Sequence, residues 1–194
     1  MKEIGDQAQA LVQEYFDACQ SASGPSVPIA PVCWTRPPSG LYKVNFDAAL
    51  FEGLGCAGIG VAIRDSSGAI IGTLSQKIPL PHSVEVAEAL TARRAIVFAQ
   101  DLCFANILVK GDCLRVVLAL RDPASCHTLY GHIVEDTHRL ACHLQSYSFS
   151  HVRRRGNLLA HALARRAVSS ADFDVWVEEL PAELLEGVFQ TDLF

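Results

Sequence analysis

The feature of this sequence that most constrains its fold is the spacing of its apolar residues. They first alternate with polar residues, as in a strand, and further along the chain they recur with the period of a helix. Val44, Phe46 and Ala48 alternate with polar residues, which is typical of a strand with one buried face. Two short apolar runs, 57–63 and 69–74, follow and are joined by a turn sequence of Asp, Ser and Gly. These residue types favour turns, so the two runs predict a β-hairpin. Three antiparallel strands are therefore expected at the start of the domain.

Helical and strand patterns alternate in the rest of the chain. A helix is expected after Ser83, whose side chain is a candidate N-cap. The later predicted elements are a strand at 107–109, helices at 114–120 and 128–144, a strand at 147–152 and a helix at 158–168. The order βββ-α-β-α-α-β-α predicts an α/β fold with a five-stranded mixed sheet flanked by helices, because hairpins pair antiparallel whereas strands joined through helices pair in parallel.

Composition divides the chain into four segments. Residues 1–20 carry an apolar stripe of helical period and predict an amphipathic helix, and the proline-rich residues 21–40 predict a linker. Residues 41–169 hold the α/β pattern with a small excess of basic groups, and residues 170–194 form an acidic tail without basic side chains. Five apolar residues of the tail could pack on the core: Trp176, Leu180, Leu184, Leu185 and Val188.

Composition also excludes several classes of protein. Half of the residues are hydrophobic and 19% are charged, which excludes general disorder. No apolar run approaches about 18 residues and the first residues lack a signal-peptide core, so we expect neither membrane association nor secretion. The 7 cysteines include no C-x-x-C pair and are odd in number, which argues against a zinc knuckle and a disulfide framework. Reduced thiols and an intracellular location, in the nucleus or the cytoplasm, are therefore expected.

Three carboxylates together predict a metal site. Asp47 lies in the first strand, Glu88 lies among small residues of the first helix, and Asp112 follows a strand whose end is expected at a crevice. Each has an ordinary explanation alone: a sheet-surface carboxylate, a solvated helix residue and a helix N-cap, respectively. As a group they fit a hard divalent cation such as Mg²⁺, which prefers carboxylate oxygens.

Several short motifs surround these carboxylates and extend towards the C-terminus. They are Trp34-x-x-Pro37-Pro38-x-Gly40-x-x-Lys43-x-Asn45-x-Asp47, Gly58-x-Gly60-x-x-x-Arg64-Asp65-x-x-Gly68, Ala87-Glu88 with Ala92, Gly111-Asp112 with Val116-Val117, His151-Val152-x-Arg154-x-x-Asn157-x-x-Ala160-His161-x-Leu163-Ala164, and Trp176 with Pro181. Together they resemble the plant ribonuclease H-like domains related to non-LTR retrotransposon reverse transcriptases, within the type 1 ribonuclease H family. The resemblance spans about residues 34–194 and implies a ribonuclease H-like fold, in agreement with the order of elements.

The resemblance implies a metal-dependent hydrolysis of the RNA strand of RNA–DNA hybrids. In that family four acidic positions hold a pair of Mg²⁺ ions. Asp47, Glu88 and Asp112 match the first three positions, and His161 stands at the fourth. A neutral imidazole suits Mn²⁺ better than Mg²⁺, so a pair of Mg²⁺ or Mn²⁺ ions is expected, with weakened binding of one. Alternatively, His161 is a helix-surface residue without a role in the site.

Further residues are candidates for supporting and binding roles. The resemblance implies that His151 assists proton transfer or product release and that Asn157 supports the active-site helix. Asn45 is a candidate for contacts to the minor groove of a hybrid. Three adjacent arginines are candidates for phosphate contacts: Arg153, Arg154 and Arg155. The ordinary alternatives are a structural strand histidine at 151 and a solvated loop for the arginines.

The expected function is that of a type 1 ribonuclease H, an endoribonuclease that acts on RNA–DNA hybrids with reduced activity because of His161. One alternative is a retroelement-derived module that still binds nucleic acid but has lost catalysis. Another is a protein-interaction domain that recruits partners through residues 1–20 and the acidic tail. The protein is expected to bind nucleic acid as a monomer.

Overall fold

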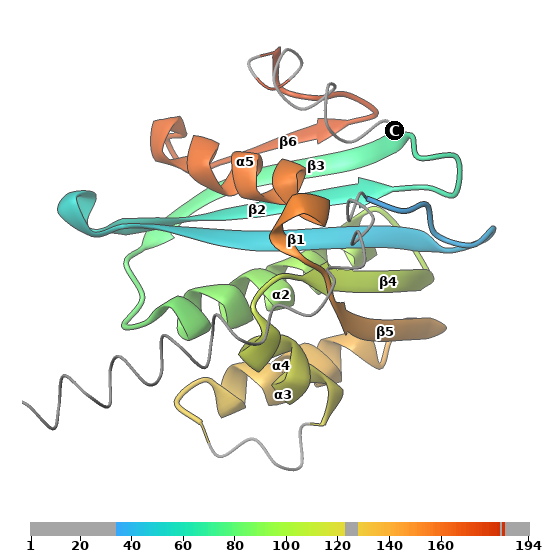
Figure 1. The fold of residues 1–194 in the computed structure, drawn as a ribbon, viewed down its shortest axis with the longest axis horizontal. Coiled ribbons are helices and arrows are strands. Elements are labelled where there is room, and N and C mark those ends of the chain that lie inside the picture. The colour runs from blue at the N-terminus through green and yellow to red at the C-terminus, as the bar shows by residue number, and fades with distance from the viewer. Residues whose placement is uncertain (1–33, 123–127, 183, 185–194) are drawn as a thin grey trace, which may run out of the picture. The chain divides into compact units, whose positions relative to one another are not determined.

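The computed structural model describes residues 34–122, 128–182 and 184, which form a mixed sheet with helices on both faces (Figure 1). The strands are β1 (Tyr42–Phe51), β2 (Cys56–Arg64), β3 (Ile70–Pro79), β4 (Asn106–Gly111), β5 (Ser146–His151) and β6 (Phe173–Val177). The α-helices are α2 (Val84–Asp101), α3 (Leu114–Arg121), α4 (Gly131–Ala141) and α5 (Leu158–Arg166). Short 3-10 helices are η1 (Glu52–Leu54), η3 (Arg154–Gly156) and η4 (Ala167–Ser169).

The strand order is β5-β4-β1-β2-β3-β6. Strands β1, β2 and β3 form an antiparallel meander, and β4 and β5 run parallel to β1. The predicted α/β fold and the order of its first strands and helices are confirmed. The expected number of five strands is wrong, because β6 pairs antiparallel with β3 at the sheet edge. This sixth strand comes from the acidic segment 170–194.

Both faces of β1 are buried, whereas its alternating pattern predicted one solvated face. Lys43, Asn45 and Asp47 are only 3%, 4% and 0% exposed. Helix α5 packs across β1, β2 and β3 on the face of the sheet that carries these three side chains. Helix α2 packs against β1, β2 and β4 (Figure 1). A strand pattern cannot show that a helix more than 100 residues later covers its polar face.

Helix α5 lies close to the sheet because β2 carries glycines beneath it. A Cβ atom at Gly60 would lie 2.1 Å from the carbonyl oxygen of Ala160, and one at Gly58 would lie 1.9 Å from that of Ala164. Any side chain at these positions would push the helix backbone away. Gly60 pairs with Asp47 across the β1–β2 ladder, so the close approach also fixes α5 beside Asp47.

Helix α2 begins where the sequence predicts, since Ser83 accepts a 3.2 Å hydrogen bond from the N–H of Val86. The predicted helix 1–20, most of the linker 21–40, and the tail residues Leu185 and Val188 lie outside the described residues. Within the described part of the chain, every helix is too short or too polar to cross a membrane.

Candidate active site

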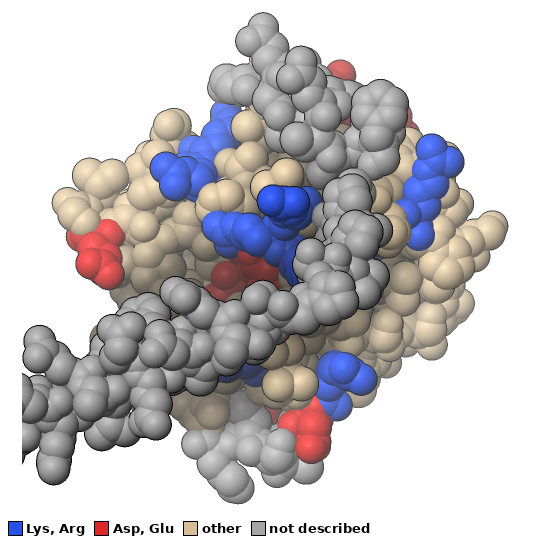
Figure 2. Space-filling view, viewed as in Figure 1, with Lys and Arg blue, Asp and Glu red and all other residues tan. Residues whose placement is uncertain are grey.

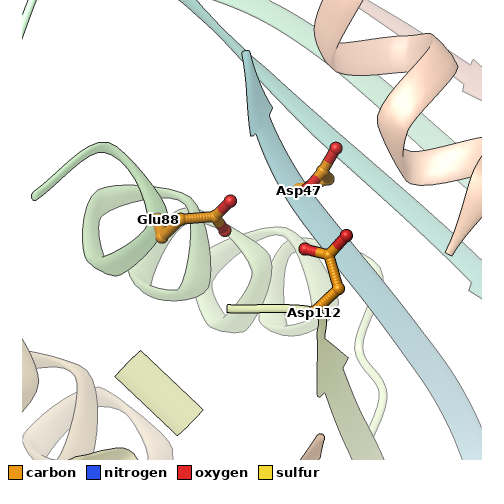
Figure 3. Close-up of side chains that lie close together, drawn as sticks. All are labelled: Asp47, Glu88 and Asp112. Carbon is orange, nitrogen blue, oxygen red and sulfur yellow. The ribbon is translucent and has the colours of Figure 1, made fainter. Parts of the chain in front are cut away.

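Asp47, Glu88 and Asp112 meet at one point of the fold, although 65 residues separate the first from the last. Their ligand oxygens all lie within 4.8 Å of one another. Figure 3 shows the side chains gathered from β1, from α2 and from the end of β4. We call these three residues the carboxylate cluster. The site that the sequence predicted as a group is thus assembled by three separate elements.

The sheet leaves an opening at the carboxylate cluster. The parallel pairing of β1 with β4 ends at Phe46 and Gly111, so Asp47 lies one residue beyond the paired segment. Gly111 also lacks the Cβ that would lie 2.3 Å from the Phe46 ring, which lets β4 approach β1 closely at its end. Side chains from the α2 face and the α5 face can therefore meet at Asp47, at the carboxyl ends of parallel strands.

Burial raises the pKa values of two members of the carboxylate cluster, Asp47 and Glu88. Desolvation, followed by the charges of Glu88 and Asp112, raises the pKa of Asp47 to about 9. Desolvation and the charge of Asp112 raise the pKa of Glu88 to about 8. Three like charges in a buried site repel one another and lack water, and a bound cation would remove both costs.

Glu88 provides an independent sign of a missing positive partner. Its carboxylate accepts a hydrogen bond from the N–H of Ala48, but the buried Oε2 atom has no hydrogen-bond partner among the described residues. Buried polar atoms in folded proteins are nearly always satisfied. An unsatisfied oxygen inside a group of three carboxylates fits a hard divalent ion such as Mg²⁺ or Mn²⁺. Asp112 is not the N-cap of α3, a position that Cys113 occupies.

His161 lies against Asp47 from the α5 side. Its Nδ1 atom is 2.7 Å from Asp47 Oδ2, which is close enough for the two groups to share a proton. Burial, followed by the charge of Arg154, lowers the pKa of His161, which favours the neutral ring. The structure thus places His161 in contact with the site, while its role there stays a prediction. The ring contacts one carboxylate of the cluster and is a candidate ligand for an ion there.

Arg154 extends into the site, which the sequence did not predict. Its Nη1 atom donates to Asp112 Oδ2 at 2.8 Å and to Asp47 Oδ1 at 3.2 Å. Its Nη2 atom lies 2.6 Å and 3.0 Å from the two ring nitrogens of His161. In the structure Arg154 thus forms ion pairs with Asp47 and Asp112, and its expected contact with a phosphate stays a prediction. The sequence of three adjacent arginines does not indicate which of them contacts the carboxylate cluster.

Asn157 ties the start of α5 to β1, as a supporting residue would. Its Nδ2 atom donates to the Phe46 carbonyl at 2.9 Å, and its Oδ1 atom accepts from Asn45 at 2.9 Å. Asn45 also accepts a 3.2 Å hydrogen bond from the Trp34 indole. The prediction that Asn45 touches nucleic acid is therefore corrected: its amide is buried and its partners are internal.

The rim of the site carries the remaining candidates. His151 ends β5, is exposed, and places Nε2 3.1 Å from the Asp112 carbonyl oxygen. Arg153 and Arg155 are exposed on the turn before α5. Figure 2 shows acidic atoms in a hollow at the centre of this face, with Lys and Arg atoms directly beside them. The site thus combines an acidic floor with a basic rim, which suits a phosphodiester substrate.

Several solved structures of similar architecture are ribonucleases H. Ribonuclease H1 from the halophilic archaeon Halobacterium salinarum NRC-1 is 25% identical, with a TM-score of 0.62 over 68% of this chain and 99% of that chain. The N-terminal RNase H domain of a Mycobacterium tuberculosis protein is 19% identical, with a TM-score of 0.60 over 66% and 94%. LC11-RNase H1, isolated from compost and solved with an RNA/DNA hybrid, is 20% identical, with a TM-score of 0.59 over 66% and 96%.

These similarities define the class: the chain has a ribonuclease H-like fold, as its motifs predicted. A family model described as reverse transcriptase-like matches residues 45–167, from β1 to the end of α5. The chain belongs to this reverse transcriptase-like family. A search of curated proteins gave no significant match.

Proposed function

We propose that this chain is a metal-dependent ribonuclease that cleaves the RNA strand of RNA–DNA hybrids. The carboxylate cluster carries the proposal, because its oxygens lie within 4.8 Å of one another and include the unsatisfied Glu88 Oε2. The ribonuclease H-like fold and the hybrid bound to the similar LC11-RNase H1 support the choice of substrate.

Asp47, Glu88 and Asp112 would hold the divalent metal, with His161 at the edge of the site. Ions bound there would activate a water molecule for attack on the phosphodiester and stabilise the leaving oxygen. Asp47 and Glu88 must first lose their protons, and their raised pKa values make that loss dependent on pH. His161 would orient Asp47 through the 2.7 Å contact between Nδ1 and Oδ2.

We propose that His151 moves a proton at the rim of the site. When its Nε2–H donates to the Asp112 carbonyl, Nδ1 carries the lone pair and can accept a proton from a reacting group. The ring is exposed at the end of β5, beside the site where we propose that a phosphodiester binds. His151 therefore acts as the proton acceptor of the proposed reaction.

Arg153 and Arg155 would contact the phosphates of the hybrid from the turn before α5. Contacts of this kind read the shape and charge of a duplex rather than its sequence. Each exposed arginine is expected to contribute to salt-dependent binding. Neither residue touches the carboxylate cluster in the way that Arg154 does.

A second function, nucleic-acid binding without catalysis, is favoured by two observations at the same site. Arg154 forms ion pairs with Asp47 and Asp112, and His161 stands where the resembled family has its fourth acidic residue. Both features reduce the negative charge available to a cation. A retroelement-derived domain of this kind would keep its basic rim and its affinity for hybrids.

Strand-specific cleavage separates the two functions. Hybrids labelled on the RNA or the DNA strand would be incubated with Mg²⁺, Mn²⁺ or EDTA, and binding would be measured in parallel by fluorescence anisotropy. Metal-dependent cleavage of the RNA strand alone is expected, faster with Mn²⁺. Salt-dependent binding without cleavage would support the second function, and the absence of both would reject the two together.

A further inference from the structure

The guanidinium of Arg154 lies within the carboxylate cluster like a bound cation. It contacts Asp112 at 2.8 Å and Asp47 at 3.2 Å, and these are two of the three carboxylates proposed to hold a metal. Its second nitrogen faces the ring of His161. Arg154 therefore contacts two of the three carboxylates that the proposed function assigns to the metal, and also the imidazole beside them.

The fold aims Arg154 at this place. In the η3 turn, the N–H of Asn157 donates to the Arg154 carbonyl at 3.0 Å. The Asn157 side chain donates to the carbonyl of Phe46, the residue before Asp47, at 2.9 Å. The backbone of the turn is thus fixed to β1 next to the carboxylate cluster. Arg153 and Arg155 are next to Arg154 in this turn, but among the described residues only Arg154 of the three forms ion pairs with the carboxylate cluster.

A guanidinium and a divalent ion cannot use the same site together. The hydrogen bonds of Arg154 engage carboxylate oxygens of Asp47 and Asp112, and oxygen lone pairs are also what a metal ion requires. Two cations at such short separation in a buried site would also repel each other strongly. The occupancy of the site by one cation therefore opposes the other.

Resting on the proposed function, we propose that Arg154 is an internal counter-cation that competes with the divalent metal for the carboxylate cluster. In the metal-free protein the guanidinium neutralises part of the buried negative charge. Metal binding displaces it from Asp47 and Asp112. The side chain is 52% exposed, so its long stem can swing into solvent without a change of the backbone. Metal affinity is consequently lower than three carboxylates alone would give.

Substitution of Arg154 tests this competition without any nucleic acid. Arg154→Ala and Arg155→Ala remove the same charge from the same turn, but only the first removes a contact to the carboxylate cluster. Mn²⁺ affinity would be measured by titration calorimetry and by the electron paramagnetic resonance signal of free Mn²⁺. We expect Arg154→Ala to bind Mn²⁺ about tenfold more tightly than the parent, equivalent to about 1.4 kcal/mol. Arg155→Ala is expected to stay within about threefold, because its charge is solvated and screened.

Thermal melting in EDTA and in Mn²⁺ gives a second readout. Arg154→Ala should show the larger rise in melting temperature on addition of Mn²⁺, since tighter binding to the folded state stabilises it more. Equal affinities and equal shifts for Arg154→Ala and Arg155→Ala would overturn the competition while leaving the metal site of the proposed function intact. Binding by Arg154→Ala but not by the parent would support it. Absence of Mn²⁺ binding in all three proteins would overturn both proposals.

Discussion

Asp47 and Glu88 are buried carboxylates whose ionisation the fold opposes, so the stability of the metal-free protein is expected to depend on pH. Their pKa values are raised to about 9 and about 8, above the values of exposed carboxylates. A raised folded-state pKa contributes stability that is complete below the unfolded pKa and is lost as pH rises through the folded pKa. From about pH 4 to about pH 9, these two groups therefore progressively destabilise the metal-free fold.

Asp47→Asn should raise the free energy of unfolding of the metal-free protein at about pH 8 by about 1 kcal/mol or more, because the amide cannot ionise. Urea unfolding in EDTA measures the effect, and the difference from the parent should shrink as pH is lowered towards 5, in line with linkage. Glu52→Gln, at an exposed position, is the control. A variant less stable than the parent at alkaline pH would contradict the account.

His161→Asp should raise Mg²⁺-supported cleavage. A carboxylate beside Asp47 adds an oxygen ligand and a negative charge, both of which favour a hard cation. A tenfold rise requires only about 1.4 kcal/mol of transition-state stabilisation. Initial rates over a Mg²⁺ series would be compared with those of His161→Asn, which is neutral and should show no gain. An unchanged Mg²⁺ dependence in His161→Asp would place this residue outside the metal site.

At the residue scale, the sequence predicted which side chains belong to the site more reliably than which residues they contact. Glu88 among small residues and Asp112 after a strand could be singled out, and Asp47 in the first strand became significant together with them. The burial of Asn45 and the inward direction of Arg154 could not be predicted, because both depend on how the turn 154–156 meets β1. That contact joins segments more than 100 residues apart.

At the scale of elements, the approach of α5 to β2 positions His161 and Asn157. Gly60→Ala should destabilise the protein by about 2–3 kcal/mol and lower cleavage. The new Cβ would clash with backbone atoms of α5, and these can move only if the helix shifts. That Cβ would lie 2.1 Å from the Ala160 oxygen and 2.3 Å from the Ala164 nitrogen. Gly53→Ala is the matched control, since nothing lies within 4 Å of its Cβ. Equal stability of the two variants would show that α5 can shift without cost.

Strand β6 joins part of the acidic segment to the sheet. Trp176 packs with Leu180 against Leu159 and Leu163, and the Arg166 guanidinium lies 4.6 Å from its ring centroid. Trp176 and Leu180 thus pack on the core, which is one of the two roles that the sequence left open for this segment. The acidic groups alone gave no sign of a strand at 173–177.

Trp176→Ala should lower the free energy of unfolding by about 2 kcal/mol, because it removes a large, partly buried ring and its cation–π contact. Phe173→Ala is the control in the same strand, since the Phe173 side chain is 53% exposed. Chemical denaturation of both variants measures the difference. A larger loss for Phe173→Ala would contradict the packing described for β6.

At the scale of the whole molecule, the order of strands and helices from residue 42 to residue 166 followed from periodicity and turn residues. The ribonuclease H-like fold followed from the motifs, and both are confirmed. What local patterns could not supply was the second covered face of β1 and the sixth strand. Both features depend on packing between segments that are far apart in the sequence, so the pattern of one segment alone does not predict them.

The central claim is that the carboxylate cluster makes this fold a metal-dependent ribonuclease. The most direct measurement is the initial rate of RNA-strand cleavage in a labelled hybrid by the parent and by Asp47→Asn, purified side by side and shown by circular dichroism to be folded. The account predicts cleavage by the parent in Mn²⁺ or Mg²⁺, none in EDTA, and a loss of at least about a thousandfold in Asp47→Asn, as expected when an ion-binding group is removed. Equal cleavage by the two proteins would contradict it.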